Sequence, residues 1–144
     1  MRKPLVYVVC FANYCRSPVA EFLLREKYVG LIDVKSAGIK PIIDSKMDGR
    51  SRAFLSEKGF NDLTHTPRKI TQKIVSNADL ILCMDHMILM TLNQLFPRAK
   101  NKFKIFTFES SVNQIDDPFQ MDSEGYIKIM NDIEKTVDEL NFTF

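Results

Sequence analysis

A cysteine that ends an apolar run, followed six positions later by an arginine, most constrains how this chain folds. Residues 5–10 (LVYVVC) are apolar and β-prone and predict a buried strand. Ser17-Pro18 predicts a helix start, since Ser caps helices and Pro fits their first turn. A strand, a short loop and a helix N-terminus together form an anion site, because the first helical N–H groups have no partner within the helix. We therefore expect the thiol of Cys10 to face a bound anion.

Apolar runs alternate with helix-period segments along the rest of the chain, a pattern typical of α/β folds with a parallel sheet. The expected strands are residues 5–10, 32–37, 80–84 and 103–108. The expected helices are residues 18–27, 52–58, 70–76, 87–95 and 126–140, and residues 110–125 form a long polar loop. The last helix presents one apolar stripe, Ile127, Met130, Ile133, Val137 and Leu140. We predict a single domain over residues 1–144, with a central four-stranded parallel sheet flanked by helices on both faces.

Composition argues against several classes of function. The 144 residues carry a formal net charge of +2 with no Lys/Arg block, which disfavours a nucleic-acid partner. The apolar runs are too short to span a bilayer, and the one behind the basic residues 1–4 is too short for a signal peptide. Three cysteines without zinc spacing or a disulfide framework indicate a reducing, cytoplasmic location. No metal, cofactor, nucleic-acid or membrane partner is expected.

The loop after Cys10 has the chemistry that a phosphate site requires. Inward N–H groups form a nest for phosphoryl oxygens, and the planar guanidinium of Arg16 binds two of them at once. The same positive field favours the thiolate, since helix N-termini and cations lower a cysteine pKa to about 3.5–7.5. Asn13 tolerates left-handed backbone, and the Ser17 hydroxyl either caps the helix or donates to the Cys10 sulfur. The alternative interpretation is that Cys10 is a buried strand cysteine and that Ser-Pro only starts a helix.

A phosphate monoester also benefits from a proton donor for its leaving group. Asp117-Pro118 lies in the long polar loop, where Pro118 keeps Asp117 out of a helix and stiffens it. The neighbouring Phe119 is suited to line an apolar pocket wall. Taken alone, an Asp-Pro pair is more typical of a solvated turn, so the acid role needs support from the rest of the chain.

Several motifs together resemble those of the low-molecular-weight protein tyrosine phosphatases. Cys10-Phe11-Ala12-Asn13-Tyr14-Cys15-Arg16-Ser17-Pro18 is similar to the family signature C-x-G-N-x-C-R-S-P. The other similar segments are Ser36-Ala37-Gly38, His65 with Arg68, Ile81-Leu82-Cys83-Met84-Asp85 and Asp117-Pro118. These motifs follow the family order over residues 6–119 and cover most of the chain. Their joint occurrence is far more specific than any one of them.

The resemblance implies hydrolysis of phosphotyrosine in protein substrates through a cysteinyl-phosphate intermediate. Cys10 would be the nucleophile, and Arg16 would bind the phosphoryl group and stabilise its transition state. Asp117 would protonate the leaving tyrosine oxygen and then activate the hydrolytic water. Such an enzyme needs no metal or cofactor, and we expect it to be a monomer.

The resemblance also implies supporting roles around the loop. The phosphate-binding loop would consist of Phe11, Ala12, Asn13, Tyr14, Cys15 and Arg16. Ser17 would steady the Cys10 thiolate. Behind the loop, Asn13, Ser36 and His65 would form a hydrogen-bond network. Without the resemblance, His65 is more typical of a surface or structural histidine.

The remaining cysteines, Cys15 and Cys83, help to distinguish phosphatase activity from arsenate reduction and redox sensing. Cys15 would trap oxidised Cys10 as a reversible disulfide, or else it is a small packing residue. Cys83 lies in an apolar strand and fits the core. The thioredoxin-coupled arsenate reductases share this fold and loop, but they pass oxidation along several cysteines, and no cysteine follows Cys83. A non-catalytic anion-binding or redox-sensing module that uses Cys10 and Cys15 is the other alternative.

The chain departs from the family pattern at several positions. Ala12 replaces the usual loop glycine, which would add strain of about 1 kcal/mol if that position needs a positive φ. Residues 40–43 (KPII) stand where the family often has a tryptophan wall, and Tyr14 offers an aromatic surface instead. Phe119-Gln120 replaces the usual paired tyrosines after Asp-Pro. These departures concern substrate preference and rate more than reaction class.

Overall fold

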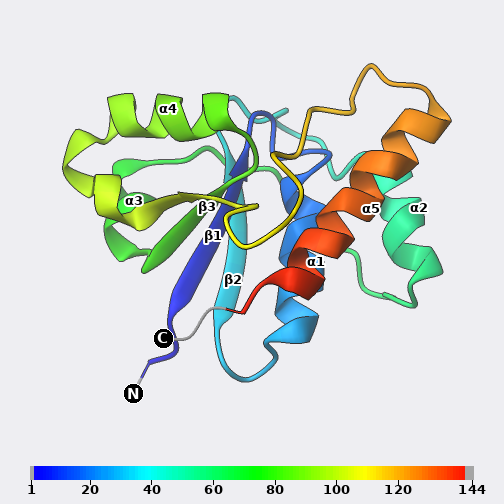
Figure 1. Cartoon of the computed structure of the whole chain (residues 1–144), viewed down its shortest axis with the longest axis horizontal. Coiled ribbons are helices and arrows are strands. Elements are labelled where there is room, and N and C mark those ends of the chain that lie inside the picture. The colour runs from blue at the N-terminus through cyan, green and yellow to red at the C-terminus, as the bar shows by residue number, and fades with distance from the viewer. Residues whose placement is uncertain (1, 142–144) are drawn as a thin grey trace.

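The computed structural model describes residues 2–141, and the ends of the predicted domain, residue 1 and residues 142–144, lie outside the described residues. A four-stranded sheet runs through the centre in the order β2-β1-β3-β4, and every neighbouring pair is parallel (Figure 1). The strands are β1 (Leu5–Cys10), β2 (Asp33–Gly38), β3 (Leu80–Cys83) and β4 (Phe103–Ile105). The α-helices are α1 (Ser17–Lys27), α2 (Gly49–Glu57), α3 (Gln72–Asn77), α4 (His86–Leu95) and α5 (Ser123–Glu139). The predicted α/β fold with a four-stranded parallel sheet is confirmed.

Helices cover both faces of the sheet, as Figure 1 shows for α1, α2 and α5 on one side and α3 and α4 on the other. Val6 and Val8 of β1 pack among buried residues of α1 and α5. Tyr7 and Val9 pack on the opposite face among buried residues of α3 and α4. Because successive side chains of a strand point to opposite faces, a strand that is apolar at every position must lie between two helical layers.

Three elements near the C-terminal end of the described chain differ from the prediction. β4 is shorter than the expected strand over residues 103–108, because the chain turns after Ile105, whose carbonyl accepts the Phe108 N–H at 3.1 Å. A 3-10 helix, η1 (Pro97–Lys102), precedes β4 and was not predicted. α5 begins before the expected residue 126, since the Asp122 side chain accepts the Gly125 N–H at 2.8 Å and caps the helix there.

The apolar face of α5 also differs in one residue. Ile127 is 46% exposed, so its place in the predicted stripe is wrong. The buried face begins instead at Tyr126 and continues through Met130, Ile133 and Val137. The reason is helical periodicity: Met130, Ile133 and Val137 lie within about 40° of Tyr126 around the helix, whereas Ile127 lies about 100° away.

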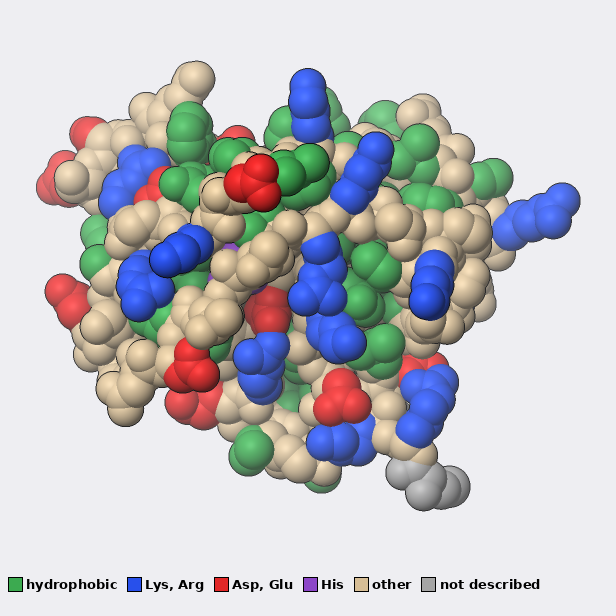
Figure 2. All heavy atoms as spheres, turned by 180° about the vertical axis from the view of Figure 1, so that it is seen from behind, with side chains coloured by type: hydrophobic (Ala, Val, Ile, Leu, Met, Phe, Trp, Pro, Cys, Tyr) green, Lys and Arg blue, Asp and Glu red, His purple; other side chains and the backbone are tan. Residues whose placement is uncertain are grey.

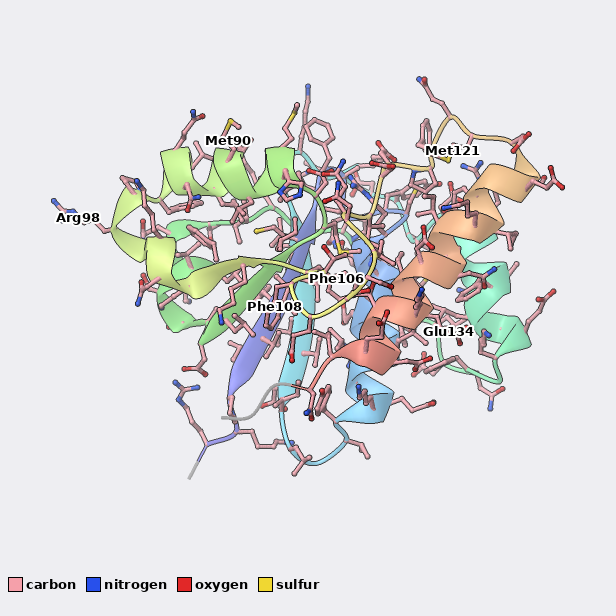
Figure 3. All side chains as sticks on the ribbon, in the orientation of Figure 1. Met90, Arg98, Phe106, Phe108, Met121 and Glu134 are labelled. Carbon is pink, nitrogen blue, oxygen red and sulfur yellow. The ribbon has the colours of Figure 1, made fainter. Side chains whose placement is uncertain are left out.

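The surface mixes charge and apolar groups. Lysine and arginine side chains are interspersed with acidic ones on the face seen in Figure 2. Met90 points outward from α4 and is 61% exposed, whereas Phe106 lies in the interior (Figure 3). Within residues 2–141, none of the helices is both long enough and apolar enough to cross a bilayer.

The carboxyl ends of β1, β2 and β3 meet at one edge of the sheet. Cys10 is in register with Gly38 of β2, and Val9 is in register with Cys83 of β3. The loops that follow these strands therefore converge, which is where open parallel sheets place their binding sites. This edge carries the residues that the sequence singled out.

Candidate active site

The loop over residues 11–16 joins β1 to α1 and turns its carbonyl groups outward. The carbonyl oxygens of Cys10, Phe11 and Ala12 accept the N–H groups of Ile39, Lys40 and Ile42 at 3.2, 2.8 and 3.3 Å. Those of Asn13, Tyr14 and Cys15 accept from the His65 ring, the Asp48 N–H and the Ser51 hydroxyl at 2.8, 3.0 and 2.7 Å. Across a trans peptide the N–H points opposite to the C=O, so the N–H groups of residues 11–16 point into the loop. Inward N–H groups of this kind form an anion-binding nest.

The backbone of the loop becomes left-handed at Asn13, with φ at 53°. Asparagine is one of the few residues that adopt this conformation readily. Ala12 has no positive φ, so the condition under which strain was expected at that position is not met. The alanine that replaces the family's glycine therefore does not lie in left-handed backbone.

A glycine is required nearby, at Gly38 of β2. A Cβ at this position would lie 2.8 Å from both the Asn13 nitrogen and the Phe11 oxygen. Both are backbone atoms, so neither can rotate away as the end of a side chain could. The Ser-Ala-Gly segment thus gives the loop a hydroxyl at Ser36 and an empty space at Gly38.

Buried hydrogen bonds connect the Cys10 sulfur to the core behind the loop. Cys10 Sγ lies 3.0 Å from Ser17 Oγ. Asn13 Nδ2 donates to Ser17 Oγ at 2.8 Å and to Ser36 Oγ at 3.0 Å. The Ser36 hydroxyl in turn donates to the carboxylate of Glu21, which is 9% exposed. The structure therefore brings Cys10, Asn13, Ser17 and Ser36 together, with Glu21 at the far end.

These bonds set the direction of the Ser17 hydroxyl. Asn13 Oδ1 accepts the Arg68 N–H at 2.9 Å, which fixes the orientation of the amide. The Glu21 carboxylate can only accept, so the Ser36 hydrogen points to it and the Ser36 oxygen accepts from Asn13. The Ser17 oxygen also accepts from Asn13, which leaves the Ser17 hydrogen for the sulfur of Cys10. Ser17 makes no capping bond, because it is already the first residue of α1, so a capping role is wrong.

Arg16 is almost fully buried, with 2% of its surface exposed. Its Nη1 donates to the Asp85 carboxylate and to the Ile115 carbonyl, each at 2.7 Å. Burial alone would lower the pKa of the Arg16 guanidinium, but the charges of Cys10 and Asp85 raise it on balance. The guanidinium therefore stays protonated while its side chain lines the pocket described below.

Asp85 and Glu21 had no predicted role in the site. Asp85 lies two residues after the end of β3, and its carboxylate caps α4 as well as accepting from Arg16. The signal was present, because β3 neighbours β1 in a parallel sheet and the residues after both strands must lie side by side. Glu21 lies one helical turn after Ser17, on the same face of α1.

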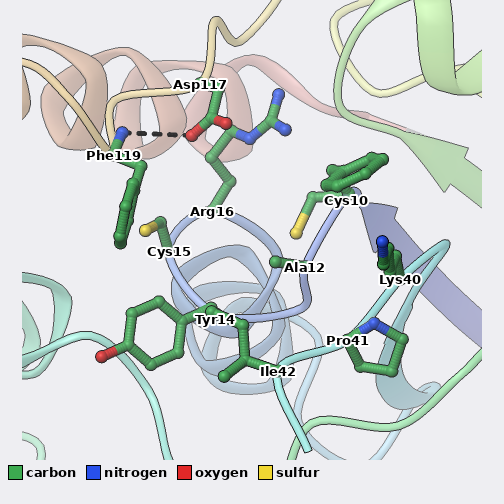
Figure 4. Close-up of a pocket in the computed structure, with 11 residues that line it drawn as sticks. Cys10, Ala12, Tyr14, Cys15, Arg16, Lys40, Pro41, Ile42, Asp117 and Phe119 are labelled. Atoms are coloured by element: carbon green, nitrogen blue, oxygen red, sulfur yellow. Dashed lines mark hydrogen bonds between the residues drawn. The ribbon is translucent and has the colours of Figure 1, made fainter.

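A cavity of about 410 Å³ brings Cys10, Arg16 and Asp117 to one place. In Figure 4, Asp117 and Arg16 lie on one side, Tyr14 and Ile42 on the other, and the Cys10 sulfur between them. The other lining residues are Phe11, Ala12, Cys15, Lys40, Pro41 and Phe119. The rings of Tyr14 and Phe119 meet edge-on, with centroids 6.3 Å apart. A flat aromatic group suits these largely apolar walls.

Asp117 occupies a stiff turn at the rim of the cavity. Its Oδ1 accepts the Phe119 N–H at 3.1 Å, and Pro118 between them restricts the backbone. Chemically, the arrangement offers a sulfur nucleophile, a nest and a guanidinium for a tetrahedral anion, and a carboxyl group for proton transfer.

Cys15 lines the pocket but is buried, with its Sγ 3.8 Å from Asp48 Oδ2. Burial raises the pKa of its thiol to about 12, so the group stays protonated at neutral pH. Burial also raises the pKa of Cys83, which packs inside β3. All three cysteines are free thiols in the structure. In the described part of the chain, no three His, Cys, Asp or Glu side chains are grouped as metal ligands.

Comparison with known sequences identifies close counterparts of this architecture. The profile of the family described as Low molecular weight phosphotyrosine protein phosphatase matches residues 5–143. The low molecular weight protein-tyrosine-phosphatase Ptp of Acinetobacter johnsonii is 34% identical over 118 residues, 81% of this chain and 81% of that protein. The phosphatase Etp of Escherichia coli K12 is 28% identical, over 93% of this chain and 90% of that protein.

Solved structures of phosphatases share the fold of this chain. The tyrosine phosphatase Wzb from Escherichia coli K30, in complex with sulphate, has a TM-score of 0.87 and 26% identity over 95% of both chains. A low molecular weight phosphotyrosine phosphatase from Vibrio cholerae O395 has a TM-score of 0.86 and 29% identity, over 94% of this chain and 93% of that chain. The YwlE arginine phosphatase from Geobacillus stearothermophilus has a TM-score of 0.86 and 29% identity, over 94% of this chain and 89% of that chain. By sequence profile, relatives and fold, the chain belongs to the low molecular weight phosphotyrosine protein phosphatase family.

Proposed function

We propose that this protein hydrolyses phosphotyrosine monoesters in proteins through a phosphorylated Cys10, without a metal or cofactor. The observation that carries the proposal is the outward bonding of the loop carbonyls from Cys10 to Cys15, which turns a nest of N–H groups toward the pocket that Cys10 lines. A phosphoryl group held by this nest and by Arg16 meets a thiol rather than water. The relatives that are protein-tyrosine-phosphatases support the same reaction.

In the first step, the Cys10 thiolate attacks phosphorus in line with the ester oxygen. The S–P bond forms while the P–O bond to the tyrosine breaks, and the leaving oxygen takes the proton of the Asp117 carboxyl. The nest and the Arg16 guanidinium stabilise the charge on the three equatorial oxygens. The Ser17 hydroxyl, directed at the sulfur by Asn13, stabilises the thiolate before attack.

In the second step, Asp117 is a carboxylate and accepts a proton from a water molecule that attacks phosphorus. The S–P bond breaks, inorganic phosphate leaves, and the Cys10 thiolate and the Asp117 acid are both restored. One carboxyl group serves both steps, because each step leaves it in the protonation state that the next one needs. Hydrogen bonding from Ser17 also makes the sulfur a better leaving group.

The pocket walls favour phosphotyrosine over phosphoarginine, which the arginine phosphatase among the structural neighbours raises as the alternative substrate. Tyr14, Ile42 and Phe119 present apolar surface to the group that follows the phosphate. A phenyl ring is stabilised by such walls, whereas a guanidinium would lose hydration against the apolar side chains. Lys40, which also lines the pocket, repels a second cation.

The other activities that share this loop fit less well. Arsenate reduction would need a cysteine relay, but Cys83 is buried in the sheet and no cysteine follows it in the sequence. A non-catalytic anion-binding or redox module would have no use for Asp117 at the rim of the pocket. A monomeric state and a cytoplasmic location stay predictions from the sequence.

Initial rates with a phosphotyrosine peptide, para-nitrophenyl phosphate and phosphoarginine test the proposal. We expect both aromatic esters to be hydrolysed well above phosphoarginine, with activity intact in EDTA and abolished by Cys10→Ser. Preference for phosphoarginine would replace the substrate assignment. Full activity of Cys10→Ser, or loss of activity in EDTA, would contradict the reaction itself.

A further inference from the structure

Asp117 lies in an irregular segment between β4 and α5, so other parts of the chain must hold it in place. The segment is fixed just before Asp117, at Ile115. The Ile115 N–H donates to the Met84 carbonyl at 2.8 Å, and the Ile115 carbonyl accepts from Arg16 at 2.7 Å. One end of the acid loop, residues 115–121, is therefore attached to the residue that binds the phosphoryl group.

The other end of the acid loop is attached to Arg50, in the first turn of α2. Arg50 Nη2 donates to the Phe119 carbonyl at 3.1 Å, and Nη1 reaches the Met121 carbonyl at 3.4 Å. The N–H of the same Phe119 donates to the carboxylate of Asp117. Phe119 thus connects the acid to Arg50: its N–H donates to Asp117, and its carbonyl accepts from Arg50.

Arg50 is itself held firmly. Its Nε and Nη2 donate to the two carboxylate oxygens of Asp48 at 3.0 and 2.9 Å. Burial alone would raise the pKa of Asp48, which is 5% exposed, but the hydrogen bonds from Arg50 lower it on balance. The guanidinium also lies over the Tyr126 ring, 4.0 Å from its centroid. A lysine could reach a carbonyl but could not make this forked contact at the same time.

The same turn of α2 also holds the phosphate-binding loop. The Asp48 N–H donates to the Tyr14 carbonyl at 3.0 Å, and the Ser51 hydroxyl donates to the Cys15 carbonyl at 2.7 Å. The start of α2 therefore bonds the nest on one side and the acid loop on the other. Its position sets the separation between the phosphorus site and the proton donor.

We propose that Arg50 is a positioning residue for proton transfer: it holds the acid loop so that the Asp117 carboxyl meets the leaving oxygen. The inference rests on the proposed role of Asp117 as the acid. Arg50 does not line the pocket and touches no reacting atom. Its loss therefore affects the step that needs a proton and spares the attack of Cys10 on a substrate whose leaving group needs none.

The test compares Arg50→Ala, Arg50→Lys and the control Arg52→Ala on two aryl phosphates. Arg52 lies on the same helix but is exposed, and it bonds the Leu63 carbonyl at 3.5 Å, away from the acid loop. With phenyl phosphate, a poor leaving group, kcat/KM of Arg50→Ala should fall about 10-fold or more. With dinitrophenyl phosphate it should fall less than about twofold. Arg50→Lys should recover part of the loss, and Arg52→Ala should match the wild type.

A second background separates positioning from a general loss of structure. The Asp117→Asn variant has no acidic proton at this position. Adding Arg50→Ala to it should therefore cause no further loss of kcat/KM with phenyl phosphate. Equal losses on both esters, or the same loss in the Asp117→Asn background, would overturn the positioning role. If Asp117→Asn itself shows no dependence on the leaving group, the acid assignment fails instead. Circular dichroism of each variant checks that it folds, and Arg50→Lys carries the test if Arg50→Ala does not.

Discussion

Replacing Gly38 with alanine should displace the loop over residues 11–16, the proposed phosphate site, without altering any group with a proposed chemical role. The added Cβ would lie 2.8 Å from the Asn13 nitrogen and the Phe11 oxygen, whereas ordinary contacts begin near 3.4 Å. Both neighbours are backbone atoms on the loop that forms the nest. The loop or β2 must therefore move apart by about 0.6 Å to admit the methyl group.

A displacement of this size has two measurable effects. Overpacking destabilises a protein by about 1–3 kcal/mol, which urea unfolding measures. Misplacing reacting groups by about 1 Å lowers rates by about 100-fold, so the smaller shift predicts a loss of at least about 10-fold in kcat/KM for para-nitrophenyl phosphate. Inhibition by inorganic phosphate and by vanadate should weaken as well, because these anions bind the N–H groups of the nest directly.

Gly49→Ala is the matched control. Gly49 is the exposed first residue of α2, and a Cβ there would meet nothing within 4 Å. This variant should keep its activity and lose no stability, since alanine is favoured over glycine in a helix by up to about 1 kcal/mol. Phosphate affinity and turnover of Gly38→Ala equal to those of Gly49→Ala would refute the claim that the loop depends on the empty space at Gly38.

Three further predictions concern single side chains. Asp117→Asn should slow phosphoenzyme formation most for poor leaving groups, since the amide has no acidic proton; burst kinetics over a series of aryl phosphates measure this, and equal slowing of all esters removes Asp117 from the acid role. Iodoacetamide near neutral pH should label Cys10 and spare Cys15, because burial raises the pKa of the Cys15 thiol to about 12; comparable labelling of both in peptide mass spectra would contradict this. Burial lowers the pKa of His65 below its usual 6.5, so the unfolded chain takes up a proton that the folded protein does not, and stability falls as the pH drops below about 6.5. Urea unfolding of His65→Gln should show a flatter pH dependence between about pH 7 and 5, and an unchanged slope would count against the burial effect.

The part of the site that rests on neighbouring residues could be predicted from the sequence. Residues 5–10 are apolar at every position, which predicts a strand buried on both faces and matches β1. Asn13 is one of the few residue types that favour left-handed backbone, and it adopts that conformation. Ala12 does not meet the condition for strain, because its φ is not positive, and the close approach that requires a glycine lies on another strand, at Gly38.

The contacts that hold the two loops together join residues that are far apart in the sequence. Arg16 and Asp85 are 69 positions apart, and so are Arg50 and Phe119. Asp85 was open to prediction, because the order of parallel strands places the end of β3 beside the end of β1. The contact between Arg50 and Phe119 could not be predicted, because Arg50 bonds a backbone carbonyl and every residue carries one.

The most direct test of the mechanism is to find where the phosphoryl group is during turnover. In Asp117→Asn, dinitrophenyl phosphate should still drive the first step, because its leaving group needs little protonation, while hydrolysis of the intermediate is slowed. Acid quench followed by peptide mass spectrometry should then show a phosphoryl group on the peptide that contains Cys10, and none in the Cys10→Ala, Asp117→Asn double variant, which has no nucleophile at this position. A phosphoryl group on another residue, or sustained turnover with no phosphorylated peptide, would contradict a reaction through the Cys10 sulfur.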